Sequence, residues 1–372
     1  MTNHHLDNLK SRPNRATTPD LQYVAPGVWA LRNVFVNLFF VRQEPSSGPW
    51  VLVDAGLPGA AGKIRHAAET LFGEASRPEA IIMTHGHFDH AGALKTLAEH
   101  WDVPVYAHRL ELPYLTGRSS YPPPDPTVGG GAMAVMSVLY PKAPYDLGNR
   151  VHELPADGSV PQLPGWRWLH TPGHTPGHVS FFRESDRLLL VGDAFVTVEQ
   201  ESAIAVWEQR QEVHGPPKYF TCDWQAARSS VEMLAQLKPA IAATGHGVAM
   251  RGDALQQELE QLAREFDRLA VPAHGRYVSQ PARADESGVV SVPPPVLNPR
   301  TPLLVGATAA VVGLAAYAIL AQRRNGSNKH LKRRKQNRMR HHHLDQPEAY
   351  VSGVIDPFAP TDESDYNPYH PI

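Results

Sequence analysis

The chain has 372 residues, a length that fits one large α/β domain with tails as well as it fits two domains. A formal net charge of −2 hides a basic block at 323–340 and an acidic tail at 344–372. The first 322 residues hold 26 Lys and Arg against 31 Asp and Glu, so we expect no nucleic acid to bind this part of the chain.

The first third of the chain predicts a sheet that begins with hairpins and continues with strand–helix units. Residues 1–20 contain no apolar segment of the signal-peptide type, and we predict a flexible N-terminus there. Apolar residues in 23–42, interrupted at Pro26-Gly27 and Arg32-Asn33, indicate hairpin-linked strands. The next predicted elements are a strand at 50–53, a helix at 60–72, a strand at 80–83, a helix at 93–101 and a strand at 103–107.

Residues 113–147 are too long for an ordinary connection and are rich in Pro, Gly, Tyr and Met. They suit a lid, with an apolar helix at 132–140, a hinge at 129–131 and a pocket lined by Tyr114, Tyr121 or Tyr145. They suit equally a structural insertion whose apolar side chains pack on the body. The sequence leaves both interpretations open.

The second half of the chain repeats the pattern of strand, loop and helix. Strands are predicted at 166–169, 179–182, 188–191 and 240–243, and helices at 224–237 and 253–269. We therefore predict one α/β domain at 21–270, followed by a Pro-rich linker at 271–302.

Polar residues that directly follow apolar strands are the recurring feature of this domain. A sheet presents its strand ends at one rim, so we expect these residues to converge. Cys222 is the only cysteine, which excludes an internal disulfide and restricts metal ligands mainly to nitrogen and oxygen. Crowding of imidazole and carboxylate groups is costly without a compensating ion. The pattern predicts a metal centre formed from Asp54, His85, His87, Asp89, His90, His174, Asp193 and His246.

Four motifs stand in the order found in a known family: Thr84-His-Gly-His-Phe-Asp-His90, Thr171-Pro-Gly-His-Thr-Pro-Gly177, Val191-Gly-Asp193 and Gly245-His-Gly247. They resemble those of the metallo-β-lactamase superfamily, especially its glyoxalase II-like hydrolases. The resemblance covers about residues 23–270 and implies an α/β fold, a four-layer αββα sandwich. It also implies that His85, His87 and His174 hold one ion, that Asp89, His90 and His246 hold a second, and that Asp193 bridges them.

The resemblance also separates branches of the family. The chain has Asp193 where the founding β-lactamases have Cys, and His87 where diiron flavoprotein relatives have Glu. It lacks the additional His-rich motif of RNA-processing relatives. Asp54 matches the acid that precedes the family's histidine cluster, and we expect it to orient a ligand histidine. His170 and His178 flank His174, and we expect them to support the ligands without binding an ion.

The resemblance implies a hydrolase with two divalent ions, best matched by Zn²⁺. Such ions share a water, lower its pKa toward about 7 and supply a bridging hydroxide that attacks a carbonyl carbon. Asp89 is the predicted catalytic residue that accepts the proton of the water. The apolar, aromatic composition of 113–147 favours a small, uncharged substrate such as an ester, thioester or lactone.

Two other functions remain compatible with the motifs. Relatives with similar histidines are mononuclear iron dioxygenases that act on a persulfide, which one iron per chain would indicate. The chain could instead be a metal-binding, membrane-tethered scaffold without catalysis, which an absence of turnover on a broad substrate panel would favour.

Residues 303–321 form a stretch of nineteen residues without a charge, about 28 Å long as a helix, and predict a transmembrane helix. Their Ala and Gly content leaves a buried or interfacial helix open. The following basic block would place residues 322–372 in the cytoplasm and the enzyme across the membrane, but no signal peptide is visible. We therefore favour a membrane-tethered protein with a cytoplasmic catalytic domain and a disordered, basic then acidic tail.

Overall fold

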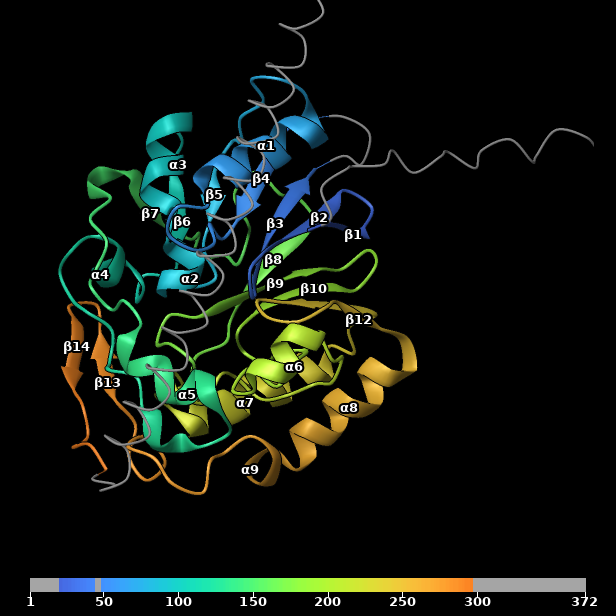
Figure 1. Ribbon diagram of the computed structural model, residues 1–372. Helices are drawn as coiled ribbons and strands as arrows, with labels where there is room; N and C mark the ends of the chain where they lie inside the picture. The colour runs from blue at the N-terminus through green and yellow to red at the C-terminus, as the bar shows by residue number, and fades with distance from the viewer. Residues whose placement is uncertain (1–19, 44–47, 297–372) are drawn as a thin grey trace, which may run out of the picture. The chain divides into compact units, whose positions relative to one another are not determined.

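The structure is a computed structural model that describes residues 20–43 and 48–296. Two mixed β-sheets face each other, and helices cover the outer face of each sheet (Figure 1). Helices α1 and α3 lie over the first sheet, and helices α7 and α8 lie over the second (Figure 1). The described residues thus form an α/β sandwich.

The first sheet contains seven strands in chain order. Strands β1 to β4 pair antiparallel, whereas β5, β6 and β7 continue parallel to β4. Parallel pairing needs a crossover, which the intervening helices provide. The strands are β1 (Leu21–Ala25), β2 (Val28–Asn33), β3 (Val36–Arg42), β4 (Trp50–Val53), β5 (Ile81–Ile82), β6 (Val105–Ala107) and β7 (Val151–Glu153).

The second sheet has the order β12-β11-β10-β9-β8. Only the β10–β11 pair is parallel, and helix α7 connects its two strands. The strands are β8 (Trp166–His170), β9 (Val179–Arg183), β10 (Leu188–Gly192), β11 (Ile241–Thr244) and β12 (Met250–Arg251).

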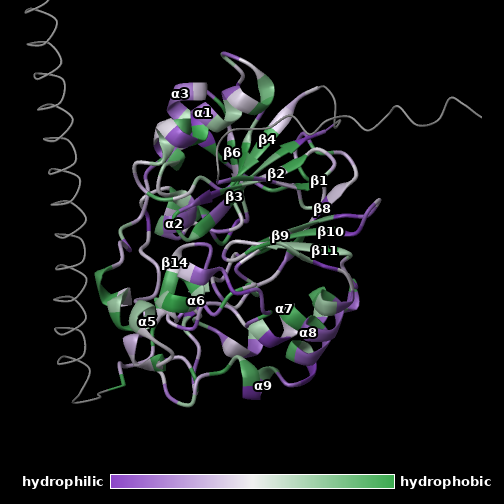
Figure 2. Cartoon of the chain, turned by 45° about the vertical axis from the view of Figure 1, so that its right-hand side comes forward, coloured by the Kyte–Doolittle hydropathy of each residue, from purple (hydrophilic) through white to green (hydrophobic). Residues whose placement is uncertain are grey.

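Helices α1, α3 and α7 begin and end close to the predicted positions, the helix predicted at 253–269 is divided into α8 and α9, and α2, α4 and α6 were not predicted. Figure 2 shows that the outer helices carry both hydrophilic and hydrophobic residues. In α8 the buried residues Leu255, Leu259 and Leu262 recur every three or four positions and face the second sheet. The α-helices are α1 (Ala61–Phe72), α2 (Phe88–Ala91), α3 (Leu94–Trp101), α4 (Leu112–Leu115), α5 (Ala132–Met136), α6 (Ala203–Glu208), α7 (Trp224–Gln236), α8 (Gly252–Arg264) and α9 (Phe266–Leu269). The short 3-10 helices are η1 (Pro126–Val128), η2 (Ser137–Leu139) and η3 (Gly148–Arg150).

Three apolar clusters fill the spaces between the layers. One lies between the first sheet and its helices, the second lies between the two sheets, and the third lies between the second sheet and α7 and α8. The middle cluster includes Phe39 of β3 and Phe181 of β9, which hold the two sheets together. Burial of such side chains contributes about 1.5–3 kcal/mol each.

The compact body continues beyond the predicted boundary at 270. Tyr277 and Ala282 are buried in the third cluster, and β13 (Arg283–Asp285) and β14 (Gly288–Ser291) form a hairpin. The hairpin is attached to the body because the Val289 N–H donates to Ser119 Oγ. A Pro-rich composition therefore did not indicate a free linker here, since tertiary contacts order the segment.

The predicted termini and membrane segment lie mainly outside the described residues. These are residues 1–19 of the N-terminus, the stretch at 303–321 and the tail at 322–372. In the parts of the chain that the structure describes, no helix has the length and apolar character needed to span a bilayer. The transmembrane helix stays a prediction.

Candidate metal centre

The fold brings strand ends from both sheets to one place. Asp54 directly follows β4, and the histidine cluster that begins at His85 follows β5, which is parallel to β4. In the second sheet, Asp193 and His246 follow the parallel strands β10 and β11, and His174 lies in the loop between β8 and β9. Parallel strands present their carboxyl ends at the same edge, so the topology explains this convergence.

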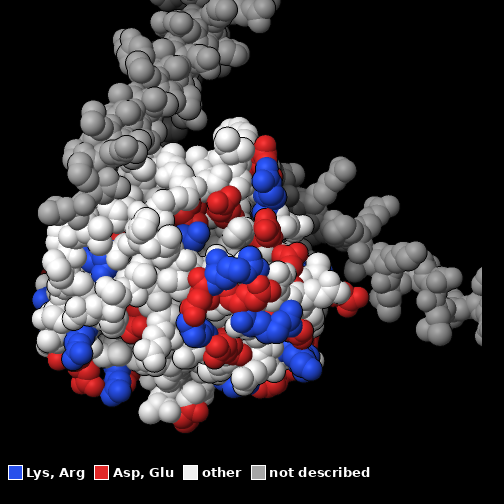
Figure 3. Space-filling view, turned by 90° about the horizontal axis from the view of Figure 1, so that it is seen from below, with Lys and Arg blue, Asp and Glu red and all other residues white. Residues whose placement is uncertain are grey.

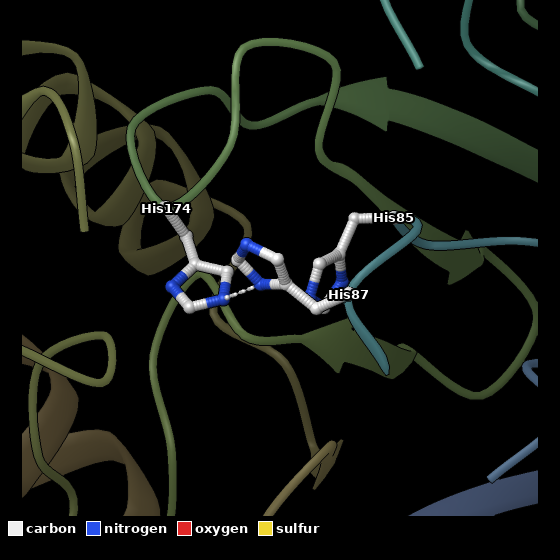
Figure 4. A group of neighbouring side chains, drawn as sticks. All are labelled: His85, His87 and His174. Atoms are coloured by element: carbon white, nitrogen blue, oxygen red, sulfur yellow. Dashed lines mark hydrogen bonds between the residues drawn. The ribbon is translucent and has the colours of Figure 1, made fainter. Parts of the chain in front are cut away.

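All seven predicted ligands are buried and form three overlapping groups. The ligand atoms within each group lie within 4.8 Å of one another. Figure 4 shows His85, His87 and His174 directed toward one another, and His87 Nδ1 is 3.0 Å from His174 Nε2. The groups are His85, His87 and His174; His85, His90 and Asp193; and Asp89, His90 and His246.

Asp193 lies between the two outer groups. Its Oδ2 is 3.4 Å from His174 Nε2 and 3.1 Å from His246 Nε2, and its Oδ1 is 3.5 Å from His90 Nε2. His246 Nε2 is also 3.5 Å from Asp89 Oδ2. This is the position expected of a bridging residue, since it contacts members of both groups.

Asp54 sets the hydrogen positions of two histidines. Its Oδ2 accepts from His90 Nδ1 and from Thr84 Oγ1, each at 2.8 Å. Because the Thr84 hydroxyl donates its hydrogen bond to Asp54, its oxygen accepts a hydrogen bond from His85 Nδ1 at 3.1 Å. Both histidines then direct Nε2 toward the cluster, and neither of these buried atoms has a hydrogen-bond partner among the described residues. A buried ring nitrogen without a partner fits a site for a bound cation.

Two further histidines are oriented in the same way. His246 Nδ1 donates to the carbonyl of Phe35 at 2.8 Å, which directs its Nε2 toward the Asp193 carboxylate, 3.1 Å away. His174 Nδ1 lies 3.4 Å from Thr221 Oγ1, whose own proton goes to the carbonyl of Pro217. Nε2 of each histidine is therefore directed at the cluster, where its unprotonated form could bind a metal ion.

The His85, His87 and His174 group is held in the neutral form. Burial lowers the pKa of His85 and His174 well below the ordinary value and lowers the pKa of His87 to about 3. Neighbouring histidines lower these pKa values further because a second positive charge would be repelled. Neutral imidazole is the form that binds a metal ion.

Negative charge governs the other group. Burial opposes protonation of His90 and His246, but the nearby carboxylates together outweigh it and raise the pKa of both: Asp193 and Asp54 act on His90, and Asp193 and Asp89 act on His246. Burial favours the neutral form of Asp193, yet the same two histidines hold its pKa well below the usual range. Burial raises the pKa of Asp89, the predicted proton acceptor. The second group therefore places carboxylates and histidines side by side, and a divalent ion would be bound by both kinds of side chain.

The two histidines that flank His174 differ in position. His178 is buried, and its Nε2 accepts the Asp193 backbone N–H at 2.8 Å. Because that lone pair is occupied, His178 supports the loop of Asp193 and is not free to bind an ion. His170 is exposed, stacks on His108 with ring centroids 4.2 Å apart, and contacts the carbonyl of Pro176. His170 thus lies outside the cluster, contrary to a role beside the ligands.

Sequence reasoning missed two residues at the site. Asn37 of β3 donates to the carbonyls of Thr244 and Gly247, which flank His246, and so links the two sheets. Glu111, a buried carboxylate, bonds to the loops that carry His85 and His174. Glu111 follows the strand predicted at 103–107, so the pattern of polar residues after apolar strands could have indicated it. No local signal marks Asn37.

Aromatic side chains surround His87 and the adjacent Phe88. Ring centroids of Phe220 and Tyr121 lie 4.4 and 4.5 Å from that of His87, and Tyr140 lies 5.2 Å from Phe88. Tyr121 and Tyr140 come from the proposed lid segment, whereas Tyr114 of that segment is fully buried and stacks on Tyr121. The segment therefore reaches the site and also packs on the body.

Two of the three glycines at the predicted hinge, Gly130 and Gly131, pack against Glu201, whereas Gly129 has open space around it. A Cβ on Gly131 would lie 2.3 Å from the carbonyl oxygen of Glu201, so the backbone passes directly against this residue. Movement of the segment as a lid stays a prediction.

The helical face of the second sheet carries charges of both signs side by side (Figure 3). Arg228 pairs with Asp267, and Arg268 pairs with Glu265 across one helical turn. Among the residues described on this face, Figure 3 shows no continuous basic area of the kind that a nucleic acid would need.

Comparison with known proteins agrees with this geometry. The family described as "Metallo-beta-lactamase superfamily" matches residues 31–246. The probable metallo-hydrolase YflN of Bacillus subtilis is 46% identical over 245 residues, which cover 66% of this chain and 93% of that protein. The probable metallo-hydrolase YybB of the same organism is 29% identical over 196 residues, covering 53% and 74%.

Solved structures with a similar arrangement include a beta-lactamase domain protein from Burkholderia ambifaria, at 22% identity and a TM-score of 0.47, covering 71% of this chain and 79% of that one. Another, TTHA1623, was crystallised in a di-iron-bound form and is 26% identical with a TM-score of 0.41, covering 65% and 97%. With the family match spanning more than half of its length, the chain belongs to the metallo-β-lactamase superfamily.

Proposed function

We propose that this protein is a hydrolase that binds two divalent ions, best matched by Zn²⁺, at the cluster between its two sheets. The observation that carries the proposal is the pair of ligand groups, His85, His87, His174 and Asp89, His90, His246, with Asp193 between them. Nitrogen and carboxylate ligands of this kind suit zinc, and they also suit other transition metals.

When bound, two such ions lower the pKa of a shared water and polarise a substrate carbonyl. The residues of the chain supply the rest of the chemistry. Asp54 accepts from His90 Nδ1, and the Phe35 carbonyl accepts from His246 Nδ1. With Nδ1 carrying the proton, Nε2 of each ring would bind an ion. Asp89 is the residue to which we assign acceptance of the water's proton, since its carboxylate lies within the second group.

For the substrate, we propose a small, uncharged ester, thioester or lactone. The support is the set of aromatic rings against the ligand loop, Phe220, Tyr121 and Tyr140. Rings of this type favour apolar groups through burial of surface.

We also propose that residues 303–321 attach the chain to a membrane, with the catalytic domain on the cytoplasmic side. The uncharged length of this stretch supports the proposal. Protease treatment of sealed vesicles tests it, since cytoplasmic residues are cleaved only where the protease has access to that side.

The test of the hydrolase is metal analysis of the full chain followed by turnover on an ester, thioester, lactone and phosphodiester panel. We expect two ions per chain and zinc-dependent cleavage of a carbonyl substrate. The Asp89→Ala variant, assayed with enough zinc to fill both sites, should lose turnover by about 100-fold or more if the residue acts as general base.

Other outcomes assign the chain differently. One iron per chain with oxygen uptake on a persulfide would indicate a dioxygenase. A metal-loaded chain with no turnover on any member of the panel would favour a scaffold. Full turnover by Asp89→Ala with both ions present would exclude its role as the proton acceptor.

A further inference from the structure

Glu111 lies in the loop between β6 and α4, and its side chain is completely buried. It has no basic partner among its hydrogen bonds, which all come from two other loops and one tyrosine. Its Oε2 accepts the Gly86 N–H at 3.0 Å, and its Oε1 accepts the Gly177 N–H at 3.0 Å and the Thr175 hydroxyl at 2.7 Å. The Tyr121 hydroxyl donates a short hydrogen bond to Oε2.

These partners belong to the loops that carry metal ligands. Gly86 lies between His85 and His87, and Thr175 directly follows His174. One carboxylate oxygen thus binds the first loop and the other oxygen binds the second. The carboxylate spans the two loops whose histidines form one of the proposed metal groups.

The backbone of both loops is shaped to admit this carboxylate. A Cβ on Gly177 would lie 2.8 Å from Glu111 Cγ, and a Cβ on Gly86 would lie 2.8 Å from the Tyr121 hydroxyl. Real Cβ atoms do not approach neighbours so closely. The backbone at both glycines therefore lies directly against Glu111 and Tyr121, and at Gly177 the close neighbours include the Glu111 backbone N at 2.8 Å, an observation independent of the hydrogen bonds.

We propose that Glu111 is a positioning residue that sets the spacing between the His85–His87 loop and His174, and thereby the affinity of the ion held by these three histidines. This inference rests on the proposed two-ion site. It predicts an asymmetric effect, because Asp89, His90 and His246 have no hydrogen bond to Glu111 among the described contacts. Tyr121 strengthens the same contact by donating to the carboxylate.

The test compares zinc release from full-length variants against a competing chelator, with the released ions counted by a colour indicator. In Glu111→Gln an amide replaces one acceptor oxygen, so one loop loses its hydrogen bonds. We expect one of the two ions to be released at a chelator activity about 10- to 100-fold lower than in the unmodified chain. The other ion should be released as before, and excess zinc should restore kcat/KM.

A matched control is Asp125→Asn. Asp125 is also a buried carboxylate that accepts a backbone N–H, that of Thr127 at 2.9 Å, but it contacts neither ligand loop. This variant should release both ions as the unmodified chain does. Tyr121→Phe should weaken binding of the same ion as Glu111→Gln does, but by a smaller factor. This variant provides the test if Glu111→Gln does not fold.

A double-mutant cycle identifies the ion concerned. In a His174→Ala background, Glu111→Gln should add little, because that ion's site is already lost. In a His246→Ala background, its effect should persist in full. The inference would be overturned if Glu111→Gln and Tyr121→Phe both released their two ions at the same chelator activity as the unmodified chain. Fewer than two ions in the unmodified chain would instead contradict the proposed function.

Discussion

The ligands from the N-terminal half of the chain lie on one short segment, the loop after β5 together with α2, whereas those from the C-terminal half come from three separate loops. His85, His87, Asp89 and His90 follow β5 within six residues. In the second sheet, His174, Asp193 and His246 follow three different strands. Each proposed ion nevertheless has ligands from both halves.

This difference shows what forms the centre. Chain geometry alone keeps the first four ligands close, while the other three meet them only when the two sheets pack. The packing is held by the apolar cluster between the sheets and by Asn37, whose side chain bonds to the carbonyls on both sides of His246. Variants in the two halves should therefore have different consequences for the ions.

The largest effect is expected from Asp193→Ala, which removes the carboxylate that contacts both ligand groups. Both ions should bind more weakly, and kcat/KM should fall by more than the roughly 100-fold typical of residues outside the ligand set. Metal content after dialysis and turnover measure this. Asp186→Ala, in the turn before β10, is the control. Retention of two tightly held ions by Asp193→Ala would remove the bridging role.

A smaller effect is expected from Asp54→Asn, which acts on the N-terminal loop from outside the ligand set. Asparagine tolerates the backbone angle at this position, where φ is +63°, so the loop should keep its path. The tautomers of His85 and His90 would no longer be set, and we expect metal affinity to fall by about 10- to 100-fold. Chelator competition measures the change.

The control for Asp54→Asn is His170→Ala. Both residues were predicted to support the ligands, but His170 is exposed and stacks on His108 outside the cluster. Its removal should leave metal affinity within about twofold. Equal losses in the two variants would show that the contact of Asp54 with His90 has no special role.

The smallest effect is expected at His108, which lies outside both halves of the centre. Its effect on the free energy of unfolding gives a reference for variants within the centre. Burial lowers its pKa to about 3, whereas an unfolded histidine titrates near 6.5. Between these values the unfolded chain binds a proton that the folded chain does not, so the free energy of unfolding falls as pH falls from 6.5 to about 3. His108→Gln should reduce this slope by up to about 1.4 kcal/mol per pH unit.

Denaturant unfolding of the zinc-loaded protein across this pH range measures the slope. Glutamine at 108 can still accept the Leu110 N–H, so the loop should remain in place. An unchanged slope would mean that His108 titrates alike in both states, and that the pH dependence comes from the cluster histidines.

The elements that the sequence predicted well are those with a strong local pattern. Helices α1, α3 and α7 begin and end within two residues of the predicted positions, because their apolar residues recur at helical spacing. Strand β7, with the short sequence Val-His-Glu, has no such pattern and was not predicted. The hairpin β13–β14 was missed for the same reason, since its order depends on contacts with residues far along the chain.

The sequence by itself determined the ligand types and the close grouping of His85, His87, Asp89 and His90, since covalent geometry keeps six residues together. Only the tertiary structure decided that His178 supports Asp193 while His170 stacks outside, because these two differ in the direction of their side chains. It also decided the place of Glu111, whose four hydrogen bonds join loops distant in sequence. Pairing between distant residues leaves no local pattern, so it becomes visible only in the folded chain.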